Sequence, residues 1–181
     1  MTLLVPAGNY RINSTLNVNT SSPGHGQANR PGLRLVGQGN GLTSIFAAVP
    51  MHAVLNYSSA GSPGFGAGAP IPTEDQYVAD IKIYASGLAN YSIFAPGMAR
   101  SRFVRVSVGG ATNVGLSLGY GWCNYIEGCR FGGNGVGIHT YNSANNIDVV
   151  NCIFEGNTGI GIYVSGGAQI NIEGNVLEGN G

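Results

Sequence analysis

The sequence repeats itself with a step of 23 residues between Tyr77 and its end. Three ladders of mostly apolar residues keep this step, and a fourth keeps it to within one residue. They are Phe103, Ile126, Val149 and Ile172; Val106, Cys129, Cys152 and Asn175; Val108, Phe131, Phe154 and Leu177; and Tyr91, Val114, Val136 and Ile160. A fixed period of this size indicates supersecondary units that bury their apolar faces against one another. The chain is therefore expected to form a solenoid.

The units are expected to be made of strands. Apolar residues alternate within a repeat, as in Ile160, Ile162 and Val164, which is strand spacing. The 31 glycines suit a fold with many tight turns, and a 23-residue repeat leaves no room for a crossover helix. The leucine-rich repeat is the alternative solenoid, but its repeated leucines are missing. The sequence therefore predicts an all-β, single-stranded right-handed parallel β-helix with about 23 residues per turn.

One β-helix domain is expected over residues 1–181, with about six to seven turns at roughly 4.8 Å per turn. Residues 1–76 would form irregular N-terminal turns with a long loop at 58–76, and residues 77–181 the regular repeats. Solenoids normally have covered ends, whereas this chain starts and stops within turns. We therefore expect it to be a fragment of a longer chain and, alone, to be marginally stable or to aggregate.

Composition excludes several classes of partner. Eight basic and eight acidic residues give a net charge of zero, which argues against nucleic acid. No apolar run is long enough for a membrane span, and no signal peptide opens this segment. Cys129 and Cys152 are expected to be adjacent free thiols in an internal ladder. We expect no metal site and no cofactor, and the few aspartates give no indication of calcium.

The first residues carry a more specific signal. It consists of the runs Val5-Pro6-Ala7-Gly8-Asn9-Tyr10-Arg11-Ile12, Leu35-Val36-Gly37-Gln38-Gly39 and Thr43-Ser44-Ile45. This opening resembles that of the pectate lyase superfamily of right-handed parallel β-helices. The resemblance implies a polysaccharide partner, because the superfamily includes pectin-degrading enzymes and bacteriophage tailspikes. It does not fix an activity, since the superfamily holds lyases, hydrolases, epimerases and non-catalytic stalks.

The candidate site follows from the strand pattern. If Phe103, Ile126, Val149 and Ile172 point inward, their sequence neighbours form two outward columns. These columns are Arg102, Tyr125, Asp148 and Asn171, and Val104, Glu127, Val150 and Glu173. We expect Glu127 and Asp148 to be the catalytic carboxylates, about 8 Å apart, as in an inverting glycosidase. Arg102, Tyr125 and Glu173 are the expected substrate-binding residues. An ordinary solvated face is the alternative.

Other polar residues are weaker candidates. Glu155 and Glu178 should stack one repeat apart, and His139 near Tyr141 is a candidate proton donor. Asn134, Asn157 and Asn180 recur at the 23-residue step and are expected to form a structural asparagine ladder.

Two functions remain open at this point. One is binding, with or without cleavage by a lyase or hydrolase, of a surface or cell-wall polysaccharide. The other is a non-catalytic shaft or adhesin, such as a tailspike or tail-fibre segment, with a homotrimer as one option. Either function places the protein outside the cell or on a virion surface.

Overall fold

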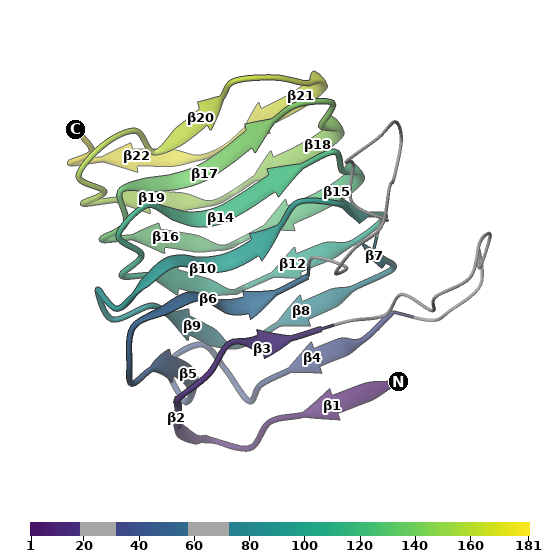
Figure 1. Cartoon of the computed structure of the whole chain (residues 1–181). Coiled ribbons are helices and arrows are strands. Elements are labelled where there is room, and N and C mark those ends of the chain that lie inside the picture. The colour runs from purple at the N-terminus through teal and green to yellow at the C-terminus, as the bar shows by residue number, and fades with distance from the viewer. Residues whose placement is uncertain (19–31, 58–72) are drawn as a thin grey trace.

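The computed structural model describes residues 1–18, 32–57 and 73–181, and these contain 22 β-strands and no helix. All paired strands are parallel, and they form three sheets that run the length of the molecule. The chain coils from the N-terminus at one end to the C-terminus at the other (Figure 1). This confirms the predicted all-β, right-handed parallel β-helix.

Each full coil contributes strands to all three sheets. Sheet A contains β1 (Thr2–Leu4), β4 (Arg34–Val36), β7 (Thr73–Glu74), β8 (Tyr77–Ala79), β11 (Met98–Ala99), β12 (Arg102–Val104), β15 (Trp122–Glu127), β18 (Asn145–Val150) and β21 (Ala168–Glu173). Sheet B contains β2 (Gly8–Ile12), β5 (Thr43–Ala47), β9 (Lys82–Tyr84), β13 (Ser107–Gly109), β16 (Arg130–Gly132), β19 (Ile153–Glu155) and β22 (Val176–Glu178). Sheet C contains β3 (Leu16–Asn17), β6 (Met51–Asn56), β10 (Ala89–Ala95), β14 (Val114–Gly119), β17 (Val136–Tyr141) and β20 (Ile162–Val164).

The register follows the 23-residue ladders. Phe103 pairs with Ile126, Ile126 with Val149, and Val149 with Ile172. In sheet C, Tyr91 pairs with Val114. One 23-residue repeat of the sequence thus corresponds to one coil of the structure, stacked on the coil before it.

Sheets A and B are separated by a very short turn that the sequence pattern did not reveal. The pattern predicts continuous strands such as Phe103–Val108, but the structure breaks each one at a residue with a left-handed backbone. These residues are Arg105 (φ 52°), Gly128 (φ 59°), Asn151 (φ 53°) and Gly174 (φ 66°). The conformation costs Gly and Asn little. The Arg105 guanidinium donates two hydrogen bonds of 2.7 Å to Asp80 on the preceding coil.

Apolar side chains fill the interior of the coil. Phe131 and Phe154 stack nearly parallel, with ring centroids 5.0 Å apart and an interplanar angle of 9°. The sequence ladder also predicts a buried Leu177, and that prediction is wrong: Leu177 is 57% exposed. Leu177 lies in the last coil of the chain, where an inward-facing side chain has a neighbouring coil on one side only.

The turns contain ladders of hydrogen bonds between successive coils. The Asn134 backbone N–H and side-chain amide both donate to Asn157 Oδ1 at 3.1 Å, and Asn157 repeats the contact with Asn180. Cys129 donates its backbone N–H to the Cys152 sulfur at 3.4 Å, and both cysteines are free. The asparagine ladder and the adjacent free thiols are confirmed. Burial raises the pKa of the Cys129 thiol, as expected for a packing role.

The predicted loop over residues 58–76 needs one correction. Thr73–Glu74 form strand β7, which pairs with β11, and Arg100 forms ion pairs with Glu74 and Asp75. Residues 73–74 therefore belong to the coil, because their main chain pairs with the next coil. The remainder of the predicted loop, residues 58–72, lies outside the described residues.

Candidate functional site

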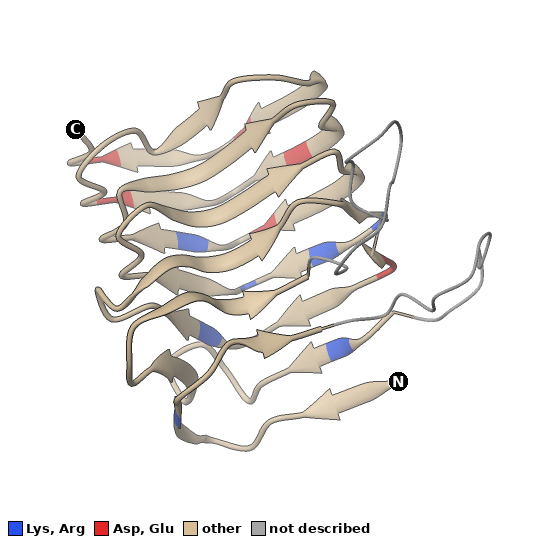
Figure 2. Cartoon of the chain, viewed as in Figure 1, with Lys and Arg blue, Asp and Glu red and all other residues tan. Residues whose placement is uncertain are grey.

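The three sheets differ in the charge that they present. Figure 2 shows Lys, Arg, Asp and Glu on the strands of sheets A and B and in the turns. The six strands of sheet C contain none of these residues. Any charged site in the described part of the chain therefore lies on sheet A, on sheet B or in a turn.

On sheet A the structure brings the predicted outward columns together. Arg102 pairs with Tyr125 and Tyr125 with Asp148, so that the three side chains follow one another along the axis. Glu127 pairs with Val150, and Val150 with Glu173, in the parallel column. Arg102 Cζ lies 5.6 Å from the centroid of the Tyr125 ring, close enough for a cation–π contact.

The first column extends further toward the N-terminus than the sequence indicates. Arg34 pairs with Tyr77, and Tyr77 with Arg102. Arg34 Cζ lies 4.4 Å from the centroid of the Tyr77 ring. Arg34, Tyr77, Arg102 and Tyr125 thus alternate a guanidinium with a phenol ring over four consecutive rungs. We call these four residues the Arg/Tyr column. Arg34 and Tyr77 escaped the sequence reasoning because 43 residues separate them instead of 23.

The two carboxylates expected to be catalytic lie at the C-terminal end of the Arg/Tyr column. Asp148 is the next residue along that column, and Glu127 lies two positions beyond Tyr125 on the same strand. Both side chains are partly exposed. They occupy neighbouring coils in the diagonal arrangement expected from the sequence, and their catalytic role stays a prediction.

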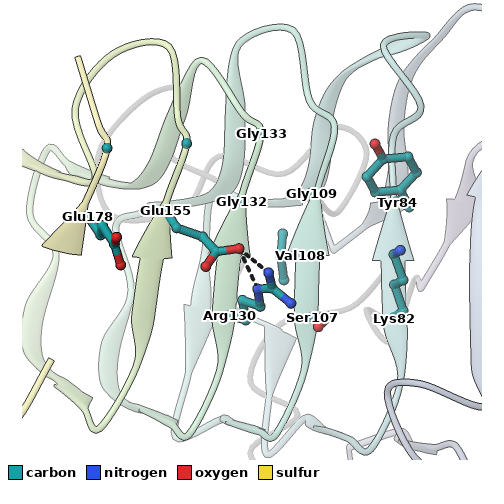
Figure 3. A pocket seen from close by; sticks show the side chains of 12 residues that line it. Lys82, Tyr84, Ser107, Val108, Gly109, Arg130, Gly132, Gly133, Glu155 and Glu178 are labelled. Atoms are coloured by element: carbon teal, nitrogen blue, oxygen red, sulfur yellow. Dashed lines mark hydrogen bonds and ion pairs between the residues drawn. The ribbon is translucent and has the colours of Figure 1, made fainter. Parts of the chain in front are cut away.

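A broad hollow of about 680 Å³ lies over sheet B. Figure 3 shows Arg130 directed at Glu155, with Glu178 on the next strand and Lys82 and Tyr84 further along. Arg130 Nε donates to Glu155 Oε1 at 2.7 Å. Glu155 and Glu178 are in register, as expected, and the guanidinium offsets the repulsion between them. The two cations and two carboxylates of this hollow balance in charge.

His139, singled out by the sequence as a proton donor, belongs to sheet C. Its ring stacks on Tyr163, with a centroid distance of 4.7 Å and an angle of 19°, and its Nε2 lies 2.7 Å from Ser165 Oγ. Burial lowers the pKa of His139. A charged imidazole is disfavoured there, because removing it from water penalises the cationic form.

Neither a metal centre nor a membrane helix is found in the ranges 1–18, 32–57 and 73–181. No three His, Cys, Asp or Glu residues there come together as a ligand set for a metal ion. No helix in that part of the chain is long and apolar enough to cross a membrane.

Comparison with known proteins identifies the class that this geometry defines. Residues 73–181 match the family model described as a right handed beta helix region. Because the match covers more than half of the chain, the protein belongs to this family, and its fold is the right-handed parallel β-helix that the sequence period predicts. A search of curated proteins finds no match.

One solved viral structure shows the same fold, and two further structures give lower similarity. ORF18 of Geobacillus virus E2 superimposes with a TM-score of 0.71 and 19% identity, over 99% of this chain and 32% of that one. A pectin methylesterase mutant in complex with a hexasaccharide gives a TM-score of 0.43 and 18% identity, over 82% of this chain and 46% of that one. The A-module of the Azotobacter vinelandii mannuronan C-5 epimerase AlgE4 gives a TM-score of 0.39 and 15% identity, over 97% of this chain and 68% of that one. This chain therefore spans about a third of the length of the viral protein.

Proposed function

We propose that this β-helix binds an extended anionic polysaccharide lengthwise along the outer face of sheet A. The observation that carries the proposal is the Arg/Tyr column, which places two guanidinium groups and two phenol rings in alternation along the axis. Rungs of a parallel sheet are about 4.8 Å apart, so that like groups recur about every 10 Å. One sugar unit of an extended polysaccharide advances by about one rung, and the column therefore matches alternate sugar units.

The chemistry of the column suits a polymer of uronic acids. A guanidinium offers a planar pair of N–H donors that matches a carboxylate. A phenol ring offers an apolar face for the C–H groups of a sugar ring and a hydroxyl for its polar edge. Arg34 and Arg102 are both exposed, and Tyr77 and Tyr125 are half-buried. Both kinds of side chain are thus accessible to a polymer that lies along the column.

Glycosidic cleavage is the second candidate function, and it rests on the position of Glu127 and Asp148. A polymer held by Arg102 and stacked on Tyr125 would bring its next linkage over these two carboxylates. One would protonate the leaving oxygen and the other would activate a water, which corresponds to inverting hydrolysis. The cleavage proposal rests on Glu127 and Asp148 alone. Binding of the polymer by the Arg/Tyr column does not require that the polymer is cleaved.

The test of binding uses the full-length protein and a panel of uronic-acid and neutral polysaccharides, with affinity measured by calorimetry. Arg102→Gln should weaken binding of the uronic-acid polymers about tenfold, or about 1.4 kcal/mol. The matched control is Arg11→Gln, which removes an exposed arginine from β2 on sheet B. Equal affinities for wild type, Arg102→Gln and Arg11→Gln would contradict the proposal.

The test of cleavage measures reducing-end release from the polysaccharides that bind. Glu127→Gln and Asp148→Asn should each abolish release while keeping affinity within about threefold, because neither carboxylate is needed to hold the polymer in this account. Undiminished release in both variants would place the chemistry elsewhere. Tight binding with no release from any polymer would favour a non-catalytic shaft, whose homotrimeric assembly and location outside the cell or on a virion remain proposals.

A further inference from the structure

Sheet C presents a row of aromatic rings on an uncharged face. His52 on β6 and Tyr91 and Phe94 on β10 pack on one another with centroid distances of 4.8 to 5.1 Å. Two coils further on, His139 packs on Tyr141 at 5.2 Å and on Tyr163 at 4.7 Å. We call these six residues the aromatic strip. It runs along the axis from β6 to β20, which face the viewer in Figure 1.

The strand between the two groups of rings is also covered. Gly119 on β14 is in register with Tyr141, and a Cβ at position 119 would stand 2.4 Å from the Tyr141 ring. The absence of a side chain at Gly119 therefore lets the Tyr141 ring lie over β14. Ser117, which is in register between Phe94 and His139, is only 2% exposed. The Tyr141 ring thus covers part of β14, the strand that separates the two groups of rings.

A hollow with aromatic walls lies beside the aromatic strip, just after the ends of β14 and β17. This hollow of about 370 Å³ is lined by Tyr120, Trp122, Ser143 and Asn145, at the turn from sheet C to sheet A. Tyr120 follows the last residue of β14 directly and has a left-handed backbone (φ 49°), which turns the chain toward β15. Hydroxyl and amide groups provide its polar lining, and none of its four residues is charged. The hollow has room for a sugar ring between polar groups and an aromatic wall.

We propose that the aromatic strip and the hollow between Tyr120 and Trp122 form a second binding surface that takes uncharged sugar rings by stacking. A neutral glycan fits better than a charged one, because the strands of sheet C offer rings and hydroxyl groups but no charge to pair with a carboxylate or a phosphate. The aromatic strip follows the axis, as an extended oligosaccharide would. This proposal does not depend on anionic binding at sheet A, which lies on another side of the coil.

The experiment uses the fluorescence of Trp122, the sole tryptophan of this chain. The wild-type protein is titrated with cellohexaose, maltohexaose and mannohexaose, and with a hexamer of galacturonic acid for comparison. At least one neutral hexasaccharide should change the emission with a saturable curve. Its affinity should be unchanged by added salt, because no ion pair contributes.

Two variants locate the binding. Tyr163→Ala removes a ring that is 42% exposed, and Tyr120→Ala opens the hollow. Each should weaken binding of the neutral hexasaccharide about tenfold, the scale of a lost central aromatic contact. Tyr10→Ala on β2 removes a comparably exposed tyrosine and should leave the affinity unchanged. Thermal melts show whether each variant folds. If Tyr120→Ala does not fold, the affinity of Tyr163→Ala alone tests the proposal.

Three results would overturn the proposal. The first is that no neutral hexasaccharide in the panel binds. The second is binding of a neutral hexasaccharide that Arg102→Gln or added salt abolishes, which would place the binding site on sheet A. The third is an oligomer that Tyr163→Ala dissociates in sedimentation, which would make the aromatic strip a protein interface. Failure of the anionic polymers alone would refute only the function proposed for sheet A.

Discussion

Phe154 shows how one residue connects the sequence period to stability. It is fully buried, it stacks on Phe131 of the preceding coil, and it comes 23 residues after it. Its neighbour Ile153 points outward and is 41% exposed. Inside and outside positions thus alternate residue by residue along β19, as the strand period requires.

Replacing Phe154 by alanine should therefore create a cavity in the coil. We expect Phe154→Ala to lower the free energy of unfolding by about 3–5 kcal/mol. Ile153→Ala on the same strand should change it by less than about 0.5 kcal/mol. Chemical denaturation of both variants checks this, and similar losses for the two would show that inside and outside are wrongly assigned.

His139 should make stability depend on pH. Burial lowers its pKa in the folded state below the ordinary 6.5, so that the unfolded chain takes up its proton first as the pH falls. The contribution of neutral His139 is complete above about pH 6.5 and is lost as the pH falls through the folded pKa. The difference in unfolding free energy between wild type and His139→Gln should therefore shrink from pH 7.5 to pH 5. A constant difference would contradict this.

At the scale of the element, side-chain hydrogen bonds join the turns of successive coils. Asn157 accepts from the backbone of Asn134 and donates to Phe131 O at 3.1 Å and to Asn180 at 2.8 Å. One buried side chain thus joins three successive coils and satisfies main-chain groups that a turn would otherwise leave unpaired.

Removing that amide should cost stability because its partners stay buried. We expect Asn157→Ala to lower the free energy of unfolding by about 1–3 kcal/mol. Asn171→Ala, at an exposed position on β21, is the matched control and should have little effect. The measurement is again denaturant unfolding, and a neutral Asn157→Ala would mean that water or neighbouring groups replace the lost bonds.

The sequence predicted most of the fold where its period is regular and less where it is not. From Tyr77 onward the 23-residue step was sufficient to place Arg102, Tyr125 and Asp148 in one column. It failed for Arg34, because the distance along the chain to Tyr77 includes extra residues that no period reveals. It also missed the break at Arg105, since a single left-handed residue leaves no apolar signature in the pattern.

The aromatic strip was invisible for a different reason. Its rings come from positions that do not share one ladder of the sequence pattern. The pattern places Tyr91 in an apolar ladder and does not connect it with His139 or Tyr163. Only the three-dimensional structure shows that the Tyr141 ring lies over Gly119 on the strand between the two groups of rings. Side-chain direction along a strand can be predicted from alternation, but the direction in which a ring leans depends on which neighbours lack a side chain.

For the whole molecule, the main consequence of the coil is that its outer faces can differ in charge while they share one core. The same interior supports an uncharged aromatic face on sheet C and a charged face on sheet A, because outward residues do not contribute to the core. The Arg/Tyr column occupies the N-terminal part of sheet A, and Glu127, Asp148 and Glu173 lie at and beyond its C-terminal end. A polymer lying along the axis would therefore meet cations first and carboxylates beyond them.

The most direct test of lengthwise binding is the dependence of affinity on the length of the ligand. The full-length protein is titrated by calorimetry with galacturonic acid oligomers of increasing length. Affinity should rise with each added unit until the oligomer covers the four rungs from Arg34 to Tyr125, and should level off beyond about four to five units. An affinity that is independent of length, or that keeps rising at the same rate past this span, would contradict binding along the Arg/Tyr column.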